Sequence, residues 1–385
     1  MSKSIAIIGS GEMAVIIADE ARRMGIVSHS FSNNPTDRVL GHSDQHHDVD
    51  IFNVHELVSI CQDLSVSGVI STTELTVSIA AKVAHEMGLN GMPVSVSEMV
   101  TDKGLVREKV SKITSIKQPI YNILNIGEKL PQIQKYPVVV KPTAMGGKRG
   151  VSVVGSDNEL QAAIEYSIEN MPASMTRIII ESYVWGKKEY SVESLSFNGS
   201  HKVIQITEKI TSGPPNCVEL GHMQPAEVPD KIRRKIECTI PELLTAVGVD
   251  NTSAHTEIKL VGDDIYLIEL NARLGGDHIS YPLTGLSTGY PYIQGAIAVA
   301  MGDYEEPDTD KFDRNACGVI FVTKQTSEVK HLFDECEQYP WLYKKNKISE
   351  ELKEIINNQA FDTNYMIYKS NEGLPQEIKR LLVKQ

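Results

Sequence analysis

The sequence predicts an α/β protein, α+β in part, built from more than one domain. Residues 1–100 alternate short apolar strands with helices, which is the rhythm of a parallel sheet. Residues 255–273 instead contain two strand-like runs joined by Gly262-Asp263-Asp264, a combination typical of an antiparallel hairpin. A chain of 385 residues is also too long for one ordinary hydrophobic core. The length therefore favours two or three domains.

Composition and charge limit the class of protein. Hydrophobic residues make up 41% of the chain and charged residues 23%, as in soluble globular proteins. The formal net charge of −12, with no dense Lys/Arg run, argues against a nucleic-acid partner. No apolar run approaches the roughly 20 residues that span a bilayer, and no signal-like leader precedes the first strand. The five cysteines never occur as Cys-x-x-Cys, which indicates a reducing compartment, so we expect a cytoplasmic protein.

The first hundred residues contain strands at 5–8, 27–31 and 68–71 and helices at 13–24 and 75–87. The turn Gly9-x-Gly11-x-x-Ala14 half-matches the dinucleotide fingerprint. That fingerprint also needs an acidic residue about 20 residues later to hold the ribose, and the second strand ends in Ser30-Phe-Ser-Asn-Asn-Pro35 without one. We therefore interpret the glycines as a structural turn.

Two other features of this part have simple explanations. His42, His46 and His47 lie beside aspartates in a polar segment without helical ligand spacing, so we expect a solvated connection rather than a metal site. Glu74 opens a helix, where a negative charge complements the helix N-terminus.

A cationic glycine loop follows the strand at 138–142. Lys141 ends this apolar strand, and a buried amine is costly without an anionic partner. The next residues, 143–151, place Gly146, Gly147 and Gly150 around Lys148 and Arg149. Such a loop offers backbone N–H groups and positive charge, which suit phosphates, although it is not the P-loop pattern.

The hairpin at 255–273 carries the most informative polar residues. Glu269, Asn271 and Arg273 stand at period two and share one strand face with Leu267. If the loop is centred on Asp263, the predicted cross-strand pairs are Lys259 with Leu267, Glu257 with Glu269, and His255 with Asn271.

Facing carboxylates destabilise a sheet by roughly 0.2–1 kcal/mol, so a cation between Glu257 and Glu269 is expected. Two carboxylates and the Asn271 amide oxygen are hard ligands that suit Mg²⁺ shared with phosphate. The alternative is a solvated hairpin face whose charges never meet. Beyond Arg273, the turn Gly275-Gly276-Asp277-His278 lies where side chains reach a ligand, whereas residues 310–385 contain no constellation to which we assign chemistry.

The order of these parts resembles the ATP-grasp superfamily of carboxylate–amine ligases over about residues 1–305. The resemblance implies an ATP-grasp fold: a leading Rossmann-like domain at 1–100, a linker helix and small central lid domain at 101–195, and a larger C-terminal domain with the metal site at 196–385. It also implies ATP and Mg²⁺ as cofactors, with two ions expected and Mn²⁺ as an alternative metal.

The resemblance further implies roles for individual residues. Lys103 and Lys141 look like the pair that holds the ATP phosphates, beneath a loop that includes Gly146, Gly147 and Lys148. Glu181, Ser182, Tyr183 and Val184 resemble the hinge that reads adenine, and Glu189 the carboxylate that holds the ribose. Glu257, Glu269 and Asn271 look like the Mg²⁺ ligands, and Arg273 like the guanidinium that steadies the transition state. The alternative for Glu189 is an ordinary polar strand face, which is also what we expect of Glu193.

Within the superfamily, His255-x-Glu257 and Gly221-His222-x-x-Pro225 look most like L-amino-acid ligases, which make dipeptides. His222 would lie near the substrates, or else be a core histidine satisfied by backbone groups; His222 and His255 are the candidate bases for the amine. Gly275, Gly276, Asp277 and His278 would contact the substrate. The loop carries Lys148-Arg149 where the commoner form has serines, which leaves its mode of closure open.

The expected reaction is ATP-dependent amide formation. Transfer of the γ-phosphoryl group turns a carboxylate into an acyl phosphate, which an amine then attacks. The first alternative is a purine-pathway carboxylase or formyl-transferring enzyme, but the turn Gly9 to Ala14 lacks the Arg/Lys residues that a nucleotide acceptor needs. A non-catalytic nucleotide-binding protein would not need the full set of metal ligands. We also expect a homodimer.

Overall fold

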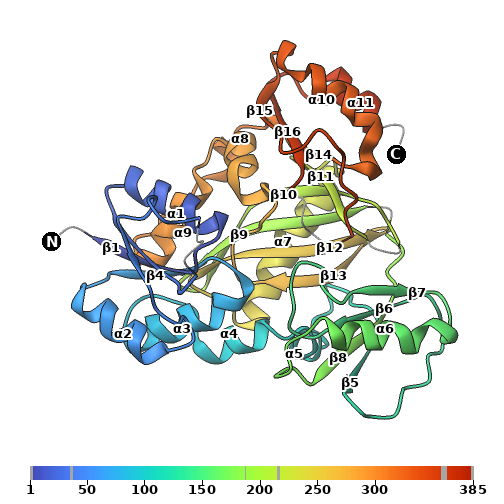
Figure 1. Cartoon of the computed structure of the whole chain (residues 1–385), viewed down its shortest axis with the longest axis horizontal. Helices are drawn as coiled ribbons and strands as arrows, with labels where there is room; N and C mark the ends of the chain where they lie inside the picture. Colours follow the sequence, from blue (N-terminus) through green and yellow to red (C-terminus); the bar gives the residue numbers. More distant parts are fainter. Residues whose placement is uncertain (1–2, 35–37, 187, 215–216, 357–361, 383–385) are drawn as a thin grey trace.

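The computed structural model describes residues 3–34, 38–186, 188–214, 217–356 and 362–382, and it contains three β-sheets (Figure 1). Two sheets have four strands each, and the third has eight. The arrangement is mixed α/β, as the sequence predicts. Within the described residues, no helix has the length and apolar character needed to cross a membrane.

The first sheet is parallel, with strand order β3-β2-β1-β4. It confirms the predicted βαβ rhythm, and all five residues of its central strand β1 are buried. Its strands are β1 (Ser4–Ile8), β2 (Val27–Phe31), β3 (Gln45–His47) and β4 (Gly68–Ser71), and its helices are α1 (Glu12–Arg23), α2 (Val54–Asp63), η1 (Glu74–Thr76), α3 (Val77–Glu86) and α4 (Val94–Val100).

The second four-stranded sheet is antiparallel, with order β5-β8-β6-β7. Its apolar face packs against one helix, because alternate residues of β6 and β8 meet Leu160 and Ile164. The elements are α5 (Lys103–Val110), β5 (Tyr121–Asn125), β6 (Val138–Pro142), β7 (Ser152–Val154), α6 (Asp157–Glu169) and β8 (Arg177–Ser182).

The eight-stranded sheet is antiparallel, with order β13-β12-β9-β10-β11-β14-β16-β15. The strands are β9 (Glu189–Phe197), β10 (Ser200–Thr211), β11 (Glu219–Gln224), β12 (Thr252–Val261), β13 (Asp264–Asn271), β14 (Ala316–Val322), β15 (Leu342–Asn346) and β16 (Asn364–Ser370). The helices are α7 (Asp230–Val247), η2 (Ile279–Leu283), α8 (Thr284–Thr288), α9 (Tyr292–Met301), η3 (Thr309–Lys311), η4 (Lys324–Val329), α10 (Lys330–Glu335), η5 (Cys336–Gln338) and α11 (Gln376–Leu382).

The hairpin β12–β13 has almost the predicted register. Glu257 lies opposite Glu269 and His255 opposite Asn271, but a bulge between Glu257 and Ile258 pairs Lys259 with Tyr266. The predicted pair of Lys259 with Leu267 is therefore wrong, because one extra residue on a strand shifts every pair beyond it.

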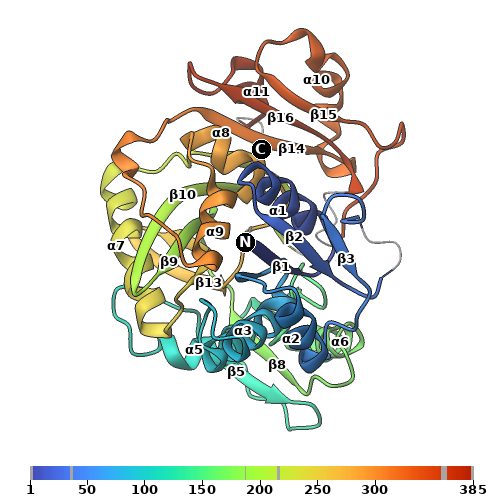
Figure 2. The same cartoon turned by 90° about the vertical axis from the view of Figure 1, so that its left-hand side faces the viewer.

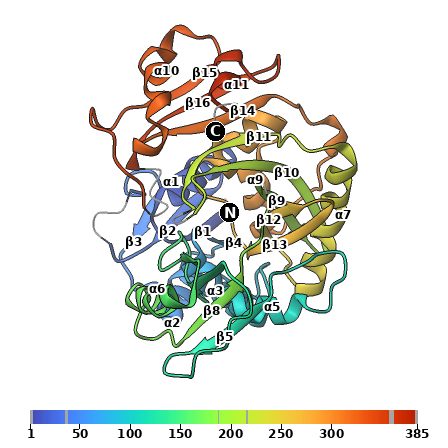
Figure 3. The same ribbon diagram turned by 90° about the vertical axis from the view of Figure 1, so that its right-hand side faces the viewer.

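The first sheet and the large sheet share a hydrophobic core, whereas the second sheet and α6 have a core of their own. Helix α1 lies against α9, so that Ile5 and Ile17 of the first part pack with Ile293 and Ile297 of the last (Figure 2). From the other side, the second sheet and α6 lie below the large sheet (Figure 3). The expected domain boundary at residue 195 falls inside strand β9, which pairs along its length within the large sheet. The domain boundaries themselves stay predictions.

Residues 316–370 extend the large sheet instead of forming a separate tail. Strand β14 pairs with β11, and β16 and β15 follow it (Figure 1). This places the C-terminal strands beside the strand that carries His222, in a region to which the sequence assigned no role.

Candidate active site

A cleft with about 870 Å³ of empty space lies between the second sheet and the large sheet. Its volume falls within the range of small-molecule sites. The sequence-predicted nucleotide and metal residues that line it are Lys103, Lys141, Gly146, Gly147, Lys148, Glu181, Ser182, Tyr183, Val184, Glu189, Glu257 and Glu269. The structure thus brings together residues from four separate segments of the chain.

Lys141 and Glu181 form a buried ion pair on the wall of the cleft. Lys141 Nζ lies 2.7 Å from Glu181 Oε2, while Arg107 Nε donates to Glu181 Oε1 at 2.7 Å. Burial alone would raise the pKa of Glu181, but the two cations lower it to about 2. Arg107 also donates to the carbonyl of Ile268 at 2.7 Å, so helix α5 is tied to β8 and β13. Arg107 was not predicted as a site residue, because in the sequence it is one charge among several on a polar helix.

Lys103, at the start of α5, also lines the cleft. The side chain of Asp102 caps this helix by accepting from the backbone N–H of Leu105 at 3.1 Å. Lys103 Nζ donates to the carbonyl of Met145 at 2.7 Å and lies 3.3 Å from Glu269 Oε1. Lys103 Nζ also lies 3.8 Å from Glu74 Oε1, which belongs to the first part of the chain. Glu74 therefore reaches the site, a position that its expected role of complementing a helix N-terminus does not explain.

The glycine loop lies over the cleft with its lysine held on the far wall. Gly147, Lys148 and Gly150 all have positive φ, between 56° and 67°. Lys148 Nζ lies 3.5 Å from Glu219 Oε1 and donates to the carbonyl of Cys217. Gly146 passes so close to Glu74 that a Cβ atom there would lie 2.5 Å from Glu74 Oε2. The loop is therefore anchored at both edges of the cleft.

The predicted metal ligands face one another as the hairpin register requires. Glu257 and Glu269 are directly opposite, and Asn271, at the end of β13, is buried. Although burial would raise the pKa of Glu257, Lys209 and His255 hold it well below its usual range. The ionised Glu257 carboxylate, the Glu269 carboxylate opposite it and the amide of Asn271 on the same strand are a set of oxygen donors that fits Mg²⁺.

Lys209 is a member of the site that the sequence reasoning missed. Its side chain is fully buried, and its ammonium group lies 2.7 Å from Glu257 Oε1, 2.7 Å from Glu219 Oε1 and 3.5 Å from Glu189 Oε1. One oxygen of each of these three carboxylates lies within 4.8 Å of the other two. The available signal in the sequence was the charge of Lys209 within the strand-like run from Ile206 to Ile210, because a charged residue inside a buried strand needs partners of opposite charge.

Glu193 lies in the interior, and the expectation of a polar strand face for it is wrong. It is fully buried, and its Oε1 lies 2.5 Å from His255 Nδ1. His255 Nε2 lies 3.3 Å from Glu257 Oε1. Burial opposes the charge on His255, but Glu193 and Glu257 raise its pKa to about 9. His255 therefore holds its proton at neutral pH, which does not suit a base for the amine.

His222 is fully buried on β11, but the alternative of a core histidine satisfied by backbone groups is wrong. Neither ring nitrogen makes a hydrogen bond within the described part of the chain, although Nε2 lies 3.1 Å from Glu219 Oε2. Burial lowers the pKa of His222 to about 3, so the ring is neutral.

The predicted substrate turn follows β13 in an unusual backbone conformation. Asp277 and His278 both have positive φ, 50° and 68°, and Gly275 N–H donates to Ser280 Oγ at 2.8 Å. The ring centroid of His278 lies 4.4 Å from that of Tyr365, so the C-terminal strands border the turn. The guanidinium group of Arg273, half-buried beside this turn, donates to the carbonyl of Leu274 at 2.9 Å.

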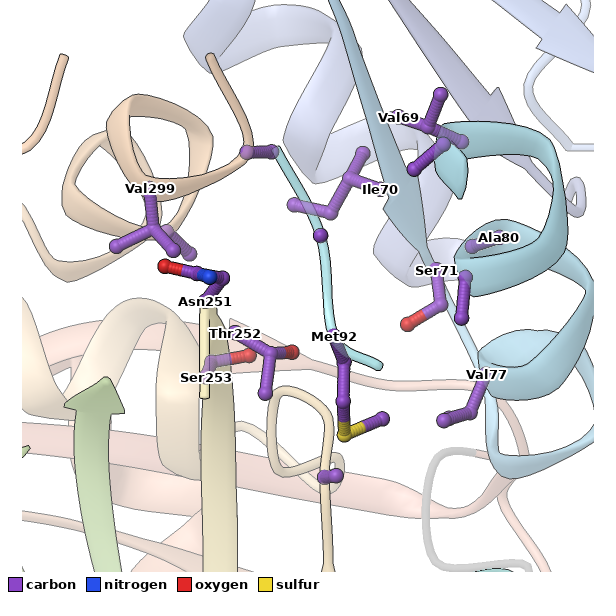
Figure 4. A pocket seen from close by; sticks show the side chains of 16 residues that line it. Val69, Ile70, Ser71, Val77, Ala80, Met92, Asn251, Thr252, Ser253 and Val299 are labelled. Carbon is purple, nitrogen blue, oxygen red and sulfur yellow. The ribbon is translucent and has the colours of Figure 1, made fainter. Parts of the chain in front are cut away.

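A second cavity, with about 460 Å³ of empty space, lies between the first sheet and the large sheet. In Figure 4, Ser71 and Val77 lie on one side of it and Asn251 and Thr252 on the other, with Met92 between them. Its described lining contains no charged side chain, in contrast to the lining of the cleft.

Comparisons with known proteins agree with this geometry. Residues 134–281 match the ATP-grasp domain family. The alanine–anticapsin ligase of Bacillus subtilis is 26% identical over 246 residues, which cover 58% of this chain and 52% of that protein. A formate-dependent phosphoribosylglycinamide formyltransferase of Corynebacterium efficiens is 25% identical over 70% of this chain and 69% of that protein. The chain thus spans about half the length of the first of these relatives.

Solved structures show the same fold. An L-amino acid ligase from Bacillus licheniformis superposes with a TM-score of 0.80 and 21% identity, over 100% of this chain and 96% of that one. The N5-carboxyaminoimidazole synthetase of Staphylococcus aureus, solved with ADP, has a TM-score of 0.75 and 14% identity, over 100% and 96% of the two chains.

Proposed function

We propose that this chain, whose residues 134–281 match the ATP-grasp domain family, is an ATP-dependent carboxylate–amine ligase with amino-acid substrates. The observation that supports this most is the facing pair Glu257 and Glu269 in a cleft that also contains Lys103, Lys141 and the glycine loop. The carboxylate oxygens of Glu257 and Glu269 suit Mg²⁺. The two lysine ammonium groups and the backbone N–H groups of the glycine loop suit the triphosphate that the ion would accompany.

The proposal assigns the parts of ATP binding to side chains that line the cleft. Lys103 and Lys141 are placed to neutralise phosphate oxygens, and residues 181–184 edge the cleft where an adenine ring would lie. Glu189, which is 3.5 Å from Lys209 and 3.6 Å from Lys259, is the proposed ribose ligand. Mg²⁺ held by Glu257, Glu269 and Asn271, with one or two ions, would neutralise the charge of the transferring phosphoryl group.

The proposed reaction has two steps. A substrate carboxylate oxygen attacks the γ-phosphorus of ATP, so that the bond to ADP breaks and an acyl phosphate forms. A neutral amine then attacks the acyl carbon, phosphate leaves, and the amine proton passes to solvent or to a protein group. Arg273 lies beside the substrate turn, where it would stabilise the oxyanion. Among the two candidate bases, His222 is neutral but weakly basic and His255 is already protonated.

A phosphate-release screen tests the proposal. Purified protein with ATP and Mg²⁺ should release phosphate and ADP only with the right amino-acid pair, and mass spectrometry should find the corresponding amide. The Glu269→Ala variant is the matched control and should show no release. Release of AMP instead of ADP, or release in the control, would contradict the proposal.

The second candidate is a purine-pathway ATP-grasp enzyme, which the similarity to the formyltransferase favours. It would need cations for the phosphate of a nucleotide acceptor near the turn after β1, yet residues 9–21 contain no Lys or Arg. Turnover with a ribonucleotide amine and not with amino acids would support this alternative. A cytoplasmic location and a homodimer stay predictions; the five cysteines are unpaired thiols, as expected in a reducing compartment.

A further inference from the structure

A lysine of the glycine loop reaches across the charged cleft to the large sheet. Lys148 belongs to the loop between β6 and β7 of the second sheet, and Glu219 is the first residue of β11 in the large sheet. Lys148 Nζ lies 3.5 Å from Glu219 Oε1 and also donates to the carbonyl of Cys217. Both contacts are made with the chain at the start of β11, so they fix the loop to the opposite side of the cleft.

The ion pair between Lys148 and Glu219 is sheltered from solvent. The side chain of Glu219 is 3% exposed and that of Lys148 is 18% exposed. Burial opposes the charge on Lys148, but Glu219 and Glu189 raise its pKa, so the ammonium group is charged at neutral pH. Because water and salt screen such a pair less than they screen a pair on the surface, the contact can hold a loop in place.

The backbone of Lys148 adopts a conformation that favours glycine. Its φ is 56°, in the left-handed region, and Gly147 and Gly150 on either side have φ values of 67°. A residue with a Cβ atom rarely adopts this conformation, whereas glycine adopts it freely. Strained residues of this kind cluster at functional sites. A lysine at this position therefore indicates a task for its side chain, and the contact with Glu219 is the task that the geometry supports.

The neighbouring cation of the loop has a different environment. Arg149 is exposed, and its Nε donates to the carbonyl of Gly146, in the same loop, at 3.2 Å. Its guanidinium group therefore supports the loop from within, while Lys148 ties the loop to another sheet. The two adjacent cations form a natural pair of test and control.

We propose that the ion pair of Lys148 and Glu219 is a latch, which holds the glycine loop closed over the cleft before a nucleotide binds. This rests on the proposed function in one respect, since the nucleotide is taken to be ATP. A loop held by phosphates alone would close only after ATP had entered. A loop held by Glu219 must instead open for the nucleotide to enter and again for it to leave. Lys148 thus acts as a positioning residue, and the closed loop would keep water away from the acyl phosphate.

Stopped-flow kinetics with Mg²⁺ and mant-ATP, a fluorescent derivative of ATP, test the latch. A latch limits entry and exit alike, so Lys148→Gln should raise the association and dissociation rate constants together, each about tenfold, with Kd changed less than about threefold. Loss of a phosphate contact would raise the dissociation rate constant alone. Loss of a positive charge would by itself slow the association of an anionic nucleotide. Faster association is therefore specific to the latch.

Three further variants separate the side chain from the backbone and from the general charge of the loop. Lys148→Gly removes the ammonium group and relieves the backbone, and it should behave as Lys148→Gln does. Lys148→Arg keeps the positive charge and should keep both rate constants within about threefold of wild type. Arg149→Gln removes the adjacent charge without a contact to Glu219, so it should leave the association rate constant within about twofold of wild type.

Three results would overturn the inference. They are unchanged or slower association in Lys148→Gln, equal acceleration in Lys148→Gln and Arg149→Gln, and failure of the wild-type protein to bind mant-ATP. The kinetics need no amino-acid substrate, so the latch and the ligase are tested separately. Faster association in Lys148→Gln without ADP release from any amino-acid pair would retain the latch and reject the ligase, while ADP release with unchanged association would do the reverse.

Discussion

Replacing Glu181 with glutamine should destabilise the protein strongly, because it would leave two cations buried without their counter-charge. Arg107 is 2% exposed and Lys141 is 7% exposed, and each has an atom 2.7 Å from the Glu181 carboxylate. Breaking a buried ion pair by removing one partner costs about 3–5 kcal/mol. The pKa gives a similar figure, since a fall from 4.5 to about 2 corresponds to about 3 kcal/mol.

Urea denaturation of wild type and Glu181→Gln at pH 7 measures this difference. Glu181 has a lower pKa in the folded protein than in the unfolded chain, so its stabilisation is present above about pH 4.5 and is lost as the pH falls towards 2. The two proteins should therefore differ by about 3 kcal/mol at pH 7 and converge in acid. Glu169→Gln, an exposed carboxylate on nearby α6, should match wild type. A loss below about 1 kcal/mol at pH 7, or one that persists unchanged at low pH, would refute the reasoning.

Three further predictions concern the polar network. Lys209→Met should lower the unfolding temperature in the absence of metal, because it removes the cation among three carboxylates. Adding Mg²⁺ should then raise the unfolding temperature of the variant more than that of wild type, because the ion replaces the lost charge. Equal shifts would contradict this. Gly275→Ala should cost about 1–3 kcal/mol, since its Cβ would lie 2.5 Å from His255 Nδ1, whereas Gly276→Ala, which meets nothing within 4 Å, should be neutral in the same denaturation assay. His255 has its pKa raised to about 9, so its stabilisation is complete below about pH 6.5 and is lost through pH 9; the melting temperature of His255→Gln should fall less than that of wild type between pH 8 and 10.

Much of the fold was predictable because it depends on local patterns. The strands at 27–31, 68–71 and 138–142 agree with the sequence expectations to the residue. Period-two spacing and a loop centred on Asp263 predicted Glu257 opposite Glu269, and the pair forms; the observed loop pairs Val261 with Asp264, and the bulge offsets this difference. The bulge beyond Glu257 was not predictable, since no glycine or proline marks it.

The parts of the site that the sequence missed are contacts between distant elements. Glu74, Arg107 and Lys209 each reach the cleft from a different segment, and a charged residue on a helix or strand looks the same whether its partner is water or a buried carboxylate. Glu193 was misjudged for the same reason, because its partner His255 lies on another strand. Residues 316–370 gained a place only through the order of the sheet, which sets β14 beside β11.

Isotope transfer tests the proposed acyl phosphate most directly. A carboxylate substrate labelled with ¹⁸O in its carboxyl group is incubated with ATP, Mg²⁺ and the amine, and the released phosphate is analysed by mass spectrometry. If a carboxylate oxygen attacks the γ-phosphorus, each phosphate released should carry one ¹⁸O atom from the substrate, and Glu269→Ala should release none. Unlabelled phosphate formed together with the amide would contradict the proposed mechanism.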